Sequence, residues 1–312
     1  MSSNRADVRD FLVTRRGRIT PQQAGLTFYG GNRRVPGLRR EEVAMLAGVS
    51  ADYYTRLEKG NLAGVSDSVL EAVATALQLN EAERLHLFDL ARTANTSPAR
   101  AGRRRPAPEV RPGIRLILNG MTDTPAFVRN GRLDILAVNP LGRALYSPVF
   151  ANPGRPANLA RFQFFDPAAR EFYPKFEDSA RTTVELLRTE AGRDPFNPSL
   201  TGLIGDLSTR SEEFRALWAA HDVRLHRSGV KSFRHPAVGL LEVMFEAMAL
   251  EADEGLTLTA YTAEPGTPSH DGLKLLASWA ATQQREDDGQ GSAGDHTQRT
   301  APLTISTTTS RG

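Results

Sequence analysis

Residues 38–60, LRREEVAMLAGVSADYYTRLEKG, constrain the fold of this chain more than any other stretch, because they show the pattern of a helix, a sharp turn and a second helix. Gly48 suits the reversal, since glycine adopts positive φ without the steric cost of a Cβ atom. Ser50 is a good N-cap for the second helix, because its side-chain oxygen can accept a bond from a free backbone N–H group. Gly60 follows the expected end of that helix, where glycine is common. The stretch therefore predicts a helix-turn-helix.

Each helix of this motif has an apolar face. Val43, Ala44 and Leu46 supply it on the first helix, while Tyr54 and Leu57 supply it on the second. A helix fits the major groove of DNA with its N-terminal residues nearest the base edges, although an ordinary helical hairpin is the alternative interpretation. The residues left on the outer face, which we expect to contact bases or adjacent phosphates, are Ser50, Ala51, Asp52, Tyr53 and Arg56.

Arginines lead into the motif and favour DNA binding over the plain hairpin. Arg33 and Arg34 precede it, and Arg39 and Arg40 lie at the expected start of its first helix, where anions such as phosphate are favoured. We expect these four arginines to contact the DNA backbone. Arg56 is the residue that we expect to recognise guanine, because arginine forms bidentate contacts with that base.

The charge of the chain is uneven along its length. Residues 1–115 contain 19 Lys and Arg against 12 Asp and Glu, a balance of +7, whereas the remaining residues contain 20 against 24, a balance of −4. A basic module joined to a neutral or acidic one is typical of a nucleic-acid-binding domain beside a sensor or an enzyme domain. With 312 residues, the chain is long enough for about two domains.

The composition excludes several classes of site. The sequence has no cysteine, which rules out disulfides, thiolate zinc sites and a cysteine nucleophile. It has no run of about 18 apolar residues and begins with a charged segment, so we expect neither a membrane span nor a signal peptide. We expect a cytoplasmic protein, associated with the nucleoid through DNA binding, with no cofactor, no metal and no membrane partner.

A helix over residues 4–16 is expected before the motif. Its apolar positions recur at helical spacing, and Gly17 can end it. These inward-facing positions are Val8, Phe11, Leu12 and Arg15. Within the motif, Glu58 fits an ion pair with an arginine of the same domain better than a contact with a base.

Two further helices are expected after the motif. Ser66 can cap the first of them, which has an amphipathic pattern. Asn80 and Glu83 have the spacing of a capping box at the start of the second. We therefore expect an all-α, five-helix, repressor-like helix-turn-helix domain over residues 1–95, followed by a Pro-, Ala- and Arg-rich linker over residues 96–112.

Residues 113–281 show a mixture of helix and strand patterns. Residues 126–138 predict two strands around an Asn-Gly turn, which is a strong hairpin signal. Alternating apolar and polar residues predict further strands over residues 230–234, 238–247 and 256–261. Helices are expected over residues 114–118, 140–146, 176–189, 198–208, 212–227 and 269–281. The pattern predicts an α+β domain in which helices pack on an antiparallel sheet.

We expect a short helix packed on the sheet at the start of this second region and a disordered tail after its end. At its start, the first helix is expected to place Leu116, Ile117 and Leu118 next to the sheet. After it, residues 282–312 are polar and poor in apolar side chains, so we expect a disordered tail without a role of its own.

Residues 34–60, RVPGLRREEVAMLAGVSADYYTRLEKG, resemble the helix-turn-helix of the phage-repressor-like (XRE) transcriptional regulators and, more narrowly, that of their MmyB-like branch. Runs of the second region resemble the same branch, namely TPAFVRNGRLDILAVNPLGRALY, NLARFQFFDPAAREFYP, AGRDP, HDVRLHRSGVKSFRHPAVG and LTAYTAEPGTPS. The resemblance implies that residues 113–281 form a PAS-like domain that binds a ligand. It also implies that fatty-acyl or similar small apolar molecules are candidate ligands.

No pattern in the sequence indicates catalysis or a metal site. His221 and His226 are five residues apart, whereas two ligands on one helical face are typically four apart. Asp222 and His226 have that spacing, but two ligands alone are weak evidence. No phosphate-binding loop or nucleophile elbow is present. We expect a protein that is not an enzyme. The alternatives are a catalytic second domain that uses His221, Asp222 and His235, or a second domain that binds a partner protein.

The sequence thus predicts a sequence-specific transcription regulator that binds a double-stranded DNA operator. We expect a homodimer, because one helix reads too few bases for useful specificity. A small-molecule ligand in the second domain would control DNA binding. Aromatic residues at the chosen positions are also common in a plain core. The residues expected to line the ligand pocket are Phe164, Trp218, His221, Arg224, Phe233, His235 and Phe245.

Overall fold

The structure, a computed structural model, describes residues 4–26, 36–95, 109–152, 156–223 and 226–295, with side chains described to residue 282. Several residues singled out by their sequence lie outside the described residues: Arg33, Arg34, Arg224, the arginines at 103–105 and residues 296–312.

The described part of the first domain contains five helices around one apolar core. Phe11, Tyr54 and Leu57 are among its most buried side chains. Asn80 and Glu83 form the expected capping box, since each backbone N–H group donates to the other residue's side-chain oxygen at 3.0 Å. The helices are α1 (Asn4–Arg18), α2 (Arg40–Leu46), α3 (Ala51–Glu58), α4 (Asp67–Ala76) and α5 (Glu81–Asn95).

Two local predictions in this domain were wrong. Helix α1 continues through Gly17 to Arg18, because one glycine within a helix costs only about 1 kcal/mol. Leu46 is 37% exposed, so the buried face of α2 consists of Val43 and Ala44. Ser66 occupies the N-cap position of α4, but its side chain does not accept a capping bond there.

The second domain combines a five-stranded antiparallel sheet with helices, which confirms the expected α+β class. The strands are β1 (Ala126–Asn130), β2 (Ile135–Val138), β3 (Ser228–His235), β4 (Gly239–Ala249) and β5 (Leu256–Thr262), in the order β2-β1-β5-β4-β3. The helices are α7 (Pro112–Gly120), α8 (Pro140–Leu145), α9 (Leu159–Phe165), α10 (Ala168–Phe172), α11 (Phe176–Arg193), α12 (Pro198–Arg210), α13 (Glu212–Ala219) and α14 (Pro268–Asp295), with a short 3-10 helix at Ser147–Phe150.

The expected hairpin forms, but its turn is longer than the Asn-Gly pair. Strand β1 ends at Asn130 and β2 begins at Ile135. The Asn130 side-chain oxygen accepts bonds from the backbone N–H groups of Arg132 (2.9 Å) and Asp134 (3.0 Å), and Leu133 takes a φ of 66°. The asparagine therefore organises a wider loop through its side chain instead of forming a two-residue turn.

The two faces of the sheet have different cover. Side chains alternate along a strand, so Phe127 of β1, Phe233 of β3 and Tyr261 of β5 lie on one face, in an aromatic cluster with residues of α8, α9 and α10. On the other face, Val128 and Leu258 form a separate cluster with Leu118 of α7. Several helices therefore cover the first face, whereas α7 packs on part of the second.

Two expectations in this domain, one on side-chain orientation and one on the end of a helix, were wrong. Leu116 and Ile117 are 73% and 56% exposed, because successive helical residues point about 100° apart and only Leu118 faces the sheet. Helix α13 ends at Ala219 instead of residue 227, and His221 follows with a φ of 55°, which a right-handed helix does not tolerate.

The polar segment after residue 281 is helical as far as Asp295, since α14 continues into it. A disordered tail was expected from residue 282. Its Gln, Arg, Glu and Ala residues are good helix formers, and extending a helix that is already anchored by Leu273 and Leu276 avoids the cost of nucleation.

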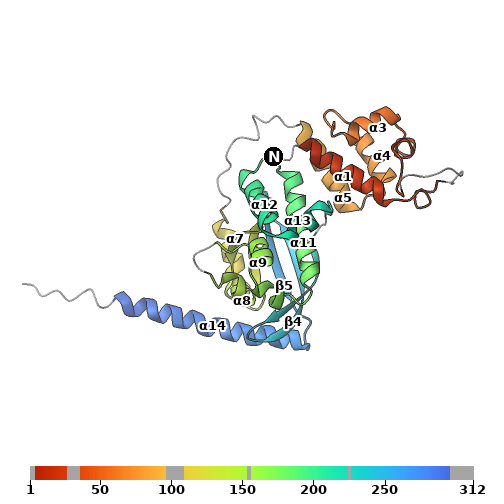
Figure 1. The fold of residues 1–312 in the computed structure, drawn as a ribbon. Coiled ribbons are helices and arrows are strands. Elements are labelled where there is room, and N and C mark those ends of the chain that lie inside the picture. Colours follow the sequence, from red (N-terminus) through yellow and green to blue (C-terminus); the bar gives the residue numbers. More distant parts are fainter. Residues whose placement is uncertain (1–3, 27–35, 96–108, 153–155, 224–225, 296–312) are drawn as a thin grey trace, which may run out of the picture.

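The two domains meet along α5 and α11, which lie side by side (Figure 1). The Thr93 hydroxyl of α5 donates to the Gly192 carbonyl oxygen of α11 at 3.3 Å. Val223, which follows α13, belongs to the buried apolar cluster of the first domain. Helix α3 lies on the part of the first domain away from this junction (Figure 1), so the contact leaves the helix-turn-helix uncovered.

Asn139 is the polar side chain that most firmly joins β1, α7 and α8. It is 0% exposed; its oxygen accepts bonds from the backbone N–H groups of Ala126 (3.0 Å) and Gly142 (2.7 Å), and its amide nitrogen donates to two carbonyl oxygens. Asn139→Ala should lower the free energy of unfolding of the second domain by about 3 kcal/mol, because several buried backbone groups lose their partners. The measurement is urea unfolding followed by the fluorescence of Trp218 and Trp279.

The matched control is Asn119→Ala, because Asn119 lies exposed on α7 in the same domain. It should change the unfolding free energy by less than about 0.5 kcal/mol. Equal effects of the two substitutions would show that the buried amide of Asn139 does not hold these elements together.

Candidate functional site

The turn between α2 and α3 has the geometry that the sequence predicts. Gly48 has a φ of 65°, and the Ser50 hydroxyl accepts a bond from the Tyr53 backbone N–H group at 3.1 Å. Gly60, with a φ of 90°, follows the end of α3. On the inner face of α3, Tyr54 and Leu57 are 0% and 1% exposed. The helix is therefore held at both ends and along one whole side.

The outer face of α3 is free within the described structure. Ser50, Ala51, Asp52 and Arg56 are exposed, as expected of residues that could meet DNA. Tyr53 is half-buried and packs against the core of the domain, so part of its ring is committed to the fold. The predicted contacts therefore share one surface, on which Tyr53 is the least accessible member.

A buried carboxylate ties the motif to α1. Glu58, at the end of α3, is 2% exposed and accepts a bond from Arg16 Nε at 2.6 Å and another from Arg40 Nε. The Arg16 guanidinium also donates to the Leu38 carbonyl oxygen at 2.8 Å. This confirms the predicted role of Glu58 as a partner of arginines in its own domain.

The same contact changes the interpretation of Arg40. Its pKa is raised by the hydrogen bond and the charge of Glu58, although half of its side chain is exposed. Arg39, the N-cap residue of α2, is exposed and lies beside it. Both can still face phosphate, but Arg40 also has a structural task that the sequence did not indicate.

A cavity of the second domain lies against the face of the sheet that carries the aromatic cluster, with a volume of about 380 Å³. Strands β1, β3, β4 and β5 contribute Arg129, Lys231, Phe245 and Tyr261 to its wall. Helix α11 contributes its N-terminal half, including Thr183 and Leu186. The wall is thus mixed, with apolar side chains beside several hydroxyl groups and the charged residues Arg129, Lys175, Asp178 and Lys231.

Of the residues predicted to line the pocket, Phe245 lies in the wall of this cavity. Phe164 and Trp218 pack on the ring of Phe214, at 5.2 and 5.5 Å between ring centroids. Phe233 is buried in the aromatic cluster of the sheet. His235 is 1% exposed, and its Nε2 atom lies 2.9 Å from the Ala144 carbonyl oxygen. These side chains contribute to the core instead of the cavity wall.

The sequence interpretation missed Arg129 and Lys231. Both lie on strands among apolar residues, at positions whose neighbours two residues away, Phe127 and Phe233, face the helices. A charged residue at an inward-facing position of a strand was the available signal. Burial lowers the pKa of Arg129, and it lowers the pKa of Lys231 to about 8, with the charge of Arg129 as the second cause.

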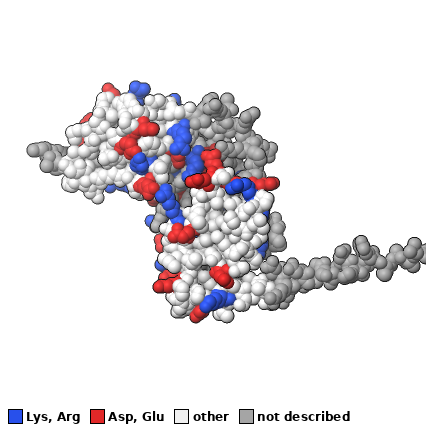
Figure 2. All heavy atoms as spheres, turned by 180° about the vertical axis from the view of Figure 1, so that it is seen from behind, with Lys and Arg blue, Asp and Glu red and all other residues white. Residues whose placement is uncertain are grey.

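His221 lies at the junction between the domains, away from the cavity wall. We define the junction network as Arg15 and Glu83 of the first domain together with Arg188, His221 and Asp222 of the second. Arg15 is 3% exposed, with its guanidinium 3.0 Å from Glu83, 3.4 Å from Asp222 and 2.5 Å from the His221 carbonyl oxygen. Figure 2 shows acidic and basic side chains gathered where the two domains meet.

The imidazole of His221 is neutral in this network. Burial, followed by the charge of Arg188, lowers its pKa to about 4. Its Nδ1 atom lies 3.0 Å from an Arg188 nitrogen and accepts that bond, because a guanidinium can only donate. Arg188 also stacks on the Trp218 ring at 4.0 Å. Arg188 and His221 therefore form part of a fixed contact between domains.

Two family models match the chain. A helix-turn-helix domain model matches residues 14–87, and the model of the MmyB-like transcription regulator ligand binding domain matches residues 110–276, more than half of the chain. The chain belongs to the MmyB-like transcription regulators. A comparison with curated proteins found no match.

The family joins the two parts of the structure in one function. An MmyB-like regulator carries a DNA-binding helix-turn-helix and a ligand-binding domain, and the chain is accordingly a DNA-binding transcription regulator. Both matched families are domains of regulators, not of enzymes. Among the described residues, the helices are too short or too polar to cross a membrane.

Removal of the Glu58 carboxylate tests how firmly the recognition helix is fixed. Glu58→Ala should reduce the free energy of local opening of α1 and α3 by about 3 kcal/mol, because Arg16 and Arg40 lose a buried partner. Native-state hydrogen exchange of the Tyr54 amide reports this opening.

Glu41→Ala is the matched control, since Glu41 is exposed on α2. It should leave exchange at Tyr54 within the range of a surface substitution, below about 0.5 kcal/mol. Unchanged protection in Glu58→Ala would show that apolar packing alone holds the helix.

Proposed function

We propose that this MmyB-like regulator recognises a specific operator through the outer face of α3. One observation carries the proposal: Tyr54 and Leu57 fix one side of α3 in the core, whereas Ser50, Ala51 and Arg56 remain exposed on the other. A rigid helix with a free N-terminal outer face is the element that enters the major groove in this class of domain.

The exposed residues divide into two roles. Arg56 would read guanine, with Asp52 and Tyr53 beside it at bases or adjacent phosphates. Arg39 and Arg40 would hold the DNA backbone, at the N-terminus of α2 where anions are favoured. We keep Arg33 and Arg34, outside the described residues, as further backbone contacts. The basic balance of residues 1–115 supports this division.

We further propose that the protein acts as a homodimer on an inverted repeat, in the cytoplasm and at the nucleoid. One recognition helix reads only a few base pairs, and two-fold symmetric operators match two-fold symmetric proteins. The regulator family supports this cellular location.

We propose no enzymatic activity. His221 lies in the junction network, and His235 contacts a backbone carbonyl oxygen elsewhere, so the two histidines do not meet at one site.

The cavity of the second domain is the site that we propose for the controlling ligand. Its volume of about 380 Å³ lies within the range of small-molecule sites. Phe127, Leu159, Leu186 and Phe245 give part of its wall an apolar character that suits a fatty-acyl or similar small apolar body.

Two segments connect this cavity to the first domain. Helix α11 lines the cavity with Thr183 and Leu186, and its other end reaches the junction at Arg188 and Gly192. After α13, Asp222 lies against Arg15, and further along the chain His226 and residues 228–232 line the cavity. We propose that a ligand changes the docking of the first domain through these segments, and so the spacing of two DNA-binding heads.

The role of Arg56 is tested by selecting DNA from a random pool at fixed physiological salt. The full chain should recover an inverted repeat, and Arg56→Ala should relax the preference at one position of each half-site by about 1–3 kcal/mol, because a bidentate base contact is lost. Arg39→Ala should weaken binding to all sequences and reduce the slope of log affinity against log salt by about one unit, because one phosphate contact is lost.

The comparison of these two variants decides the roles. Arg92→Ala is the control, because Arg92 is an exposed arginine of the same domain on α5, away from α3. If Arg56→Ala and Arg39→Ala have the same effect on selected and random DNA, the division into base and backbone contacts is wrong. A recovered site without two-fold symmetry would contradict the dimer.

Asp222→Asn tests the junction network. Asp222 lies 2.7 Å from Arg18 and 3.4 Å from Arg15, so loss of its charge leaves the buried Arg15 with Glu83 as its carboxylate partner. We expect faster hydrogen exchange in α5 and at residues 220–223, corresponding to about 1–3 kcal/mol of lost docking energy. Asp206→Asn is the control, because Asp206 forms its ion pairs within the second domain. Unchanged hydrogen exchange in Asp222→Asn would contradict the proposal that the junction network transmits ligand binding to the first domain.

A further inference from the structure

Two buried cations face the same cavity without a carboxylate partner. Arg129 of β1 is 8% exposed, and Lys231 of β3 is partly accessible because it forms part of the cavity wall. Strands β5 and β4 separate them in the sheet, so both side chains reach over its centre. Burying a charge is costly unless it is paired and hydrogen-bonded. The groups that stabilise these two charges therefore need to be identified.

The protein offers these cations little compensation. Among the described residues, no ion pair within 4.0 Å involves Arg129 or Lys231, and the polar contacts that they make are long: Arg129 to the Asn130 carbonyl oxygen at 3.4 Å and Lys231 to the Tyr146 hydroxyl at 3.5 Å. The aromatic rings of Tyr146, Tyr173 and Phe233 lie 4.9–5.8 Å from the Lys231 ammonium and stabilise it in part.

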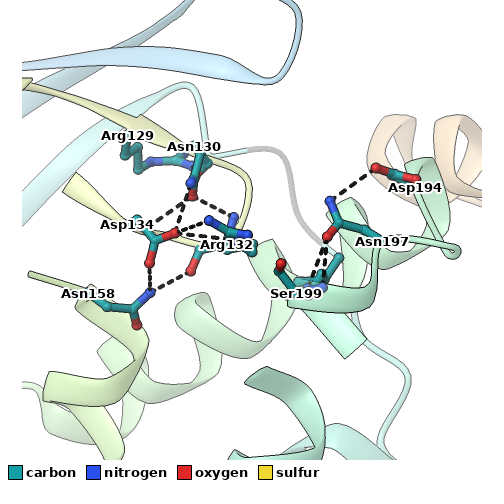
Figure 3. A network of polar contacts seen from close by, with 9 residues as sticks. Arg129, Asn130, Arg132, Asp134, Asn158, Asp194, Asn197 and Ser199 are labelled. Atoms are coloured by element: carbon teal, nitrogen blue, oxygen red, sulfur yellow. Dashed lines mark hydrogen bonds and ion pairs between the residues drawn. The ribbon is translucent and has the colours of Figure 1, made fainter. Parts of the chain in front are cut away.

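The nearest acidic groups are committed elsewhere. Figure 3 shows Asn130, Arg132 and Asn158 converging on Asp134, with Arg129 outside this cluster. Glu190 acts on Arg129 only at longer range, and burial raises the pKa of Glu190. Asp178 lines the cavity as an exposed residue. Among the described residues, Arg129 and Lys231 therefore each lack a fixed counter-charge.

Hydrogen-bond donors lie beside the two cations. The hydroxyl oxygens of Tyr146 and Tyr261 are 2.6 Å apart, and burial raises the pKa of both tyrosines, so both keep their protons. One hydroxyl donates to the other, which leaves one proton of the pair for another acceptor. Tyr261 and Thr259 line the cavity, and so does the apolar wall formed by Phe127, Leu159 and Phe245.

We propose that the cavity binds a small organic carboxylate, whose acid group lies between Arg129 and Lys231 and whose apolar body lies against Phe127, Leu159 and Phe245. The inference rests on the proposed function in one respect, namely that this cavity is the site of the controlling ligand. A single negative charge matches the site, because the aromatic rings already compensate Lys231 in part while Arg129 has no such cover. A carboxylate also fits the planar fork of an arginine.

The test is calorimetric titration of the full chain with phenylbutyrate, its neutral amide phenylbutyramide, and phenylpropyl phosphate. Phenylbutyrate should bind about tenfold or more tightly than the amide, as expected when charge-assisted hydrogen bonds are lost. Arg129→Met and Lys231→Met should each remove this difference, because they keep an apolar side chain and remove the charge. Binding of the amide should change little in either variant.

Arg234→Met is the matched control, since Arg234 is an exposed residue of β3 on the opposite face of the sheet from Lys231. It should keep the full preference for the acid. Urea unfolding followed by Trp218 and Trp279 fluorescence verifies that each variant is folded. If Lys231→Met is unstable, Lys231→Arg provides a second test, because it keeps the charge and should keep the preference.

The pH dependence is a second readout. Burial holds the pKa of Lys231 at about 8, so the affinity for phenylbutyrate should fall as the pH rises through and above that value, and Lys231→Met should lack this fall. The charged and titratable groups around Lys231 are Arg129, Tyr146, Tyr173 and Tyr261, of which the tyrosines have raised pKa values. Lys175, Asp178 and His226 line the same cavity.

The outcomes separate this inference from the proposed function. Equal binding of acid and amide, tighter binding of the phosphate ester, or binding of none of the three compounds overturns the carboxylate assignment. DNA selection on the same preparation tests the regulator function independently. A recovered operator without acid binding overturns the carboxylate alone, whereas acid binding without any selected DNA sequence overturns the proposed function and supports the cavity assignment.

Discussion

The arrangement of the two domains depends on one buried charge. Arg15 projects from α1 into the junction, where Glu83 of its own domain and the Asp222 and His221 region of the second domain surround its guanidinium. Burial lowers its pKa, while the two carboxylates counteract that effect. Glu83 alone would pair with this buried charge in the isolated first domain, so docking of the second domain adds the Asp222 carboxylate and the His221 carbonyl oxygen to its partners. The same geometry keeps α3 clear of the contact.

The structure treats its buried cations in two ways. Arg15 receives two carboxylates and a carbonyl oxygen, as a group with a structural task does. Arg129 and Lys231 receive long contacts and aromatic rings, although they are comparably enclosed. Removing the partner of Arg15 would weaken a contact between domains, whereas adding a partner to Arg129 would relieve a cost that the folded chain already carries. This contrast distinguishes Arg15, whose charge stabilises the fold, from Arg129 and Lys231, whose charges we propose bind a ligand.

Local chemistry explains how much the sequence could predict. Gly48, Ser50 and Gly60 specify the helix-turn-helix through φ angles and a capping bond, which depend on neighbours in sequence. The cavity depends on the strand order β2-β1-β5-β4-β3, which brings residues 129, 231 and 261 over one face. No spacing rule encodes that order. Of the aromatic residues chosen from the sequence, Phe245 lies in the cavity wall, whereas Phe164, Trp218 and Phe233 proved to be core. The cavity wall also contains charges that composition alone would place on the surface.

The junction and the cavity share their supporting elements, which gives control a physical basis. Helix α11 reaches the junction network at Arg188 and the cavity wall at Leu186, whereas His221 and Asp222 lie in the junction network and His226 lies in the cavity wall. An anion that draws Arg129 and Lys231 together acts on β1 and β3, and β3 begins at Ser228. A ligand can shift an equilibrium only by its different affinity for two states. In the control that we propose, the docked position seen in the structure, with its junction network intact, is one of these states, and a position with that network broken is the other.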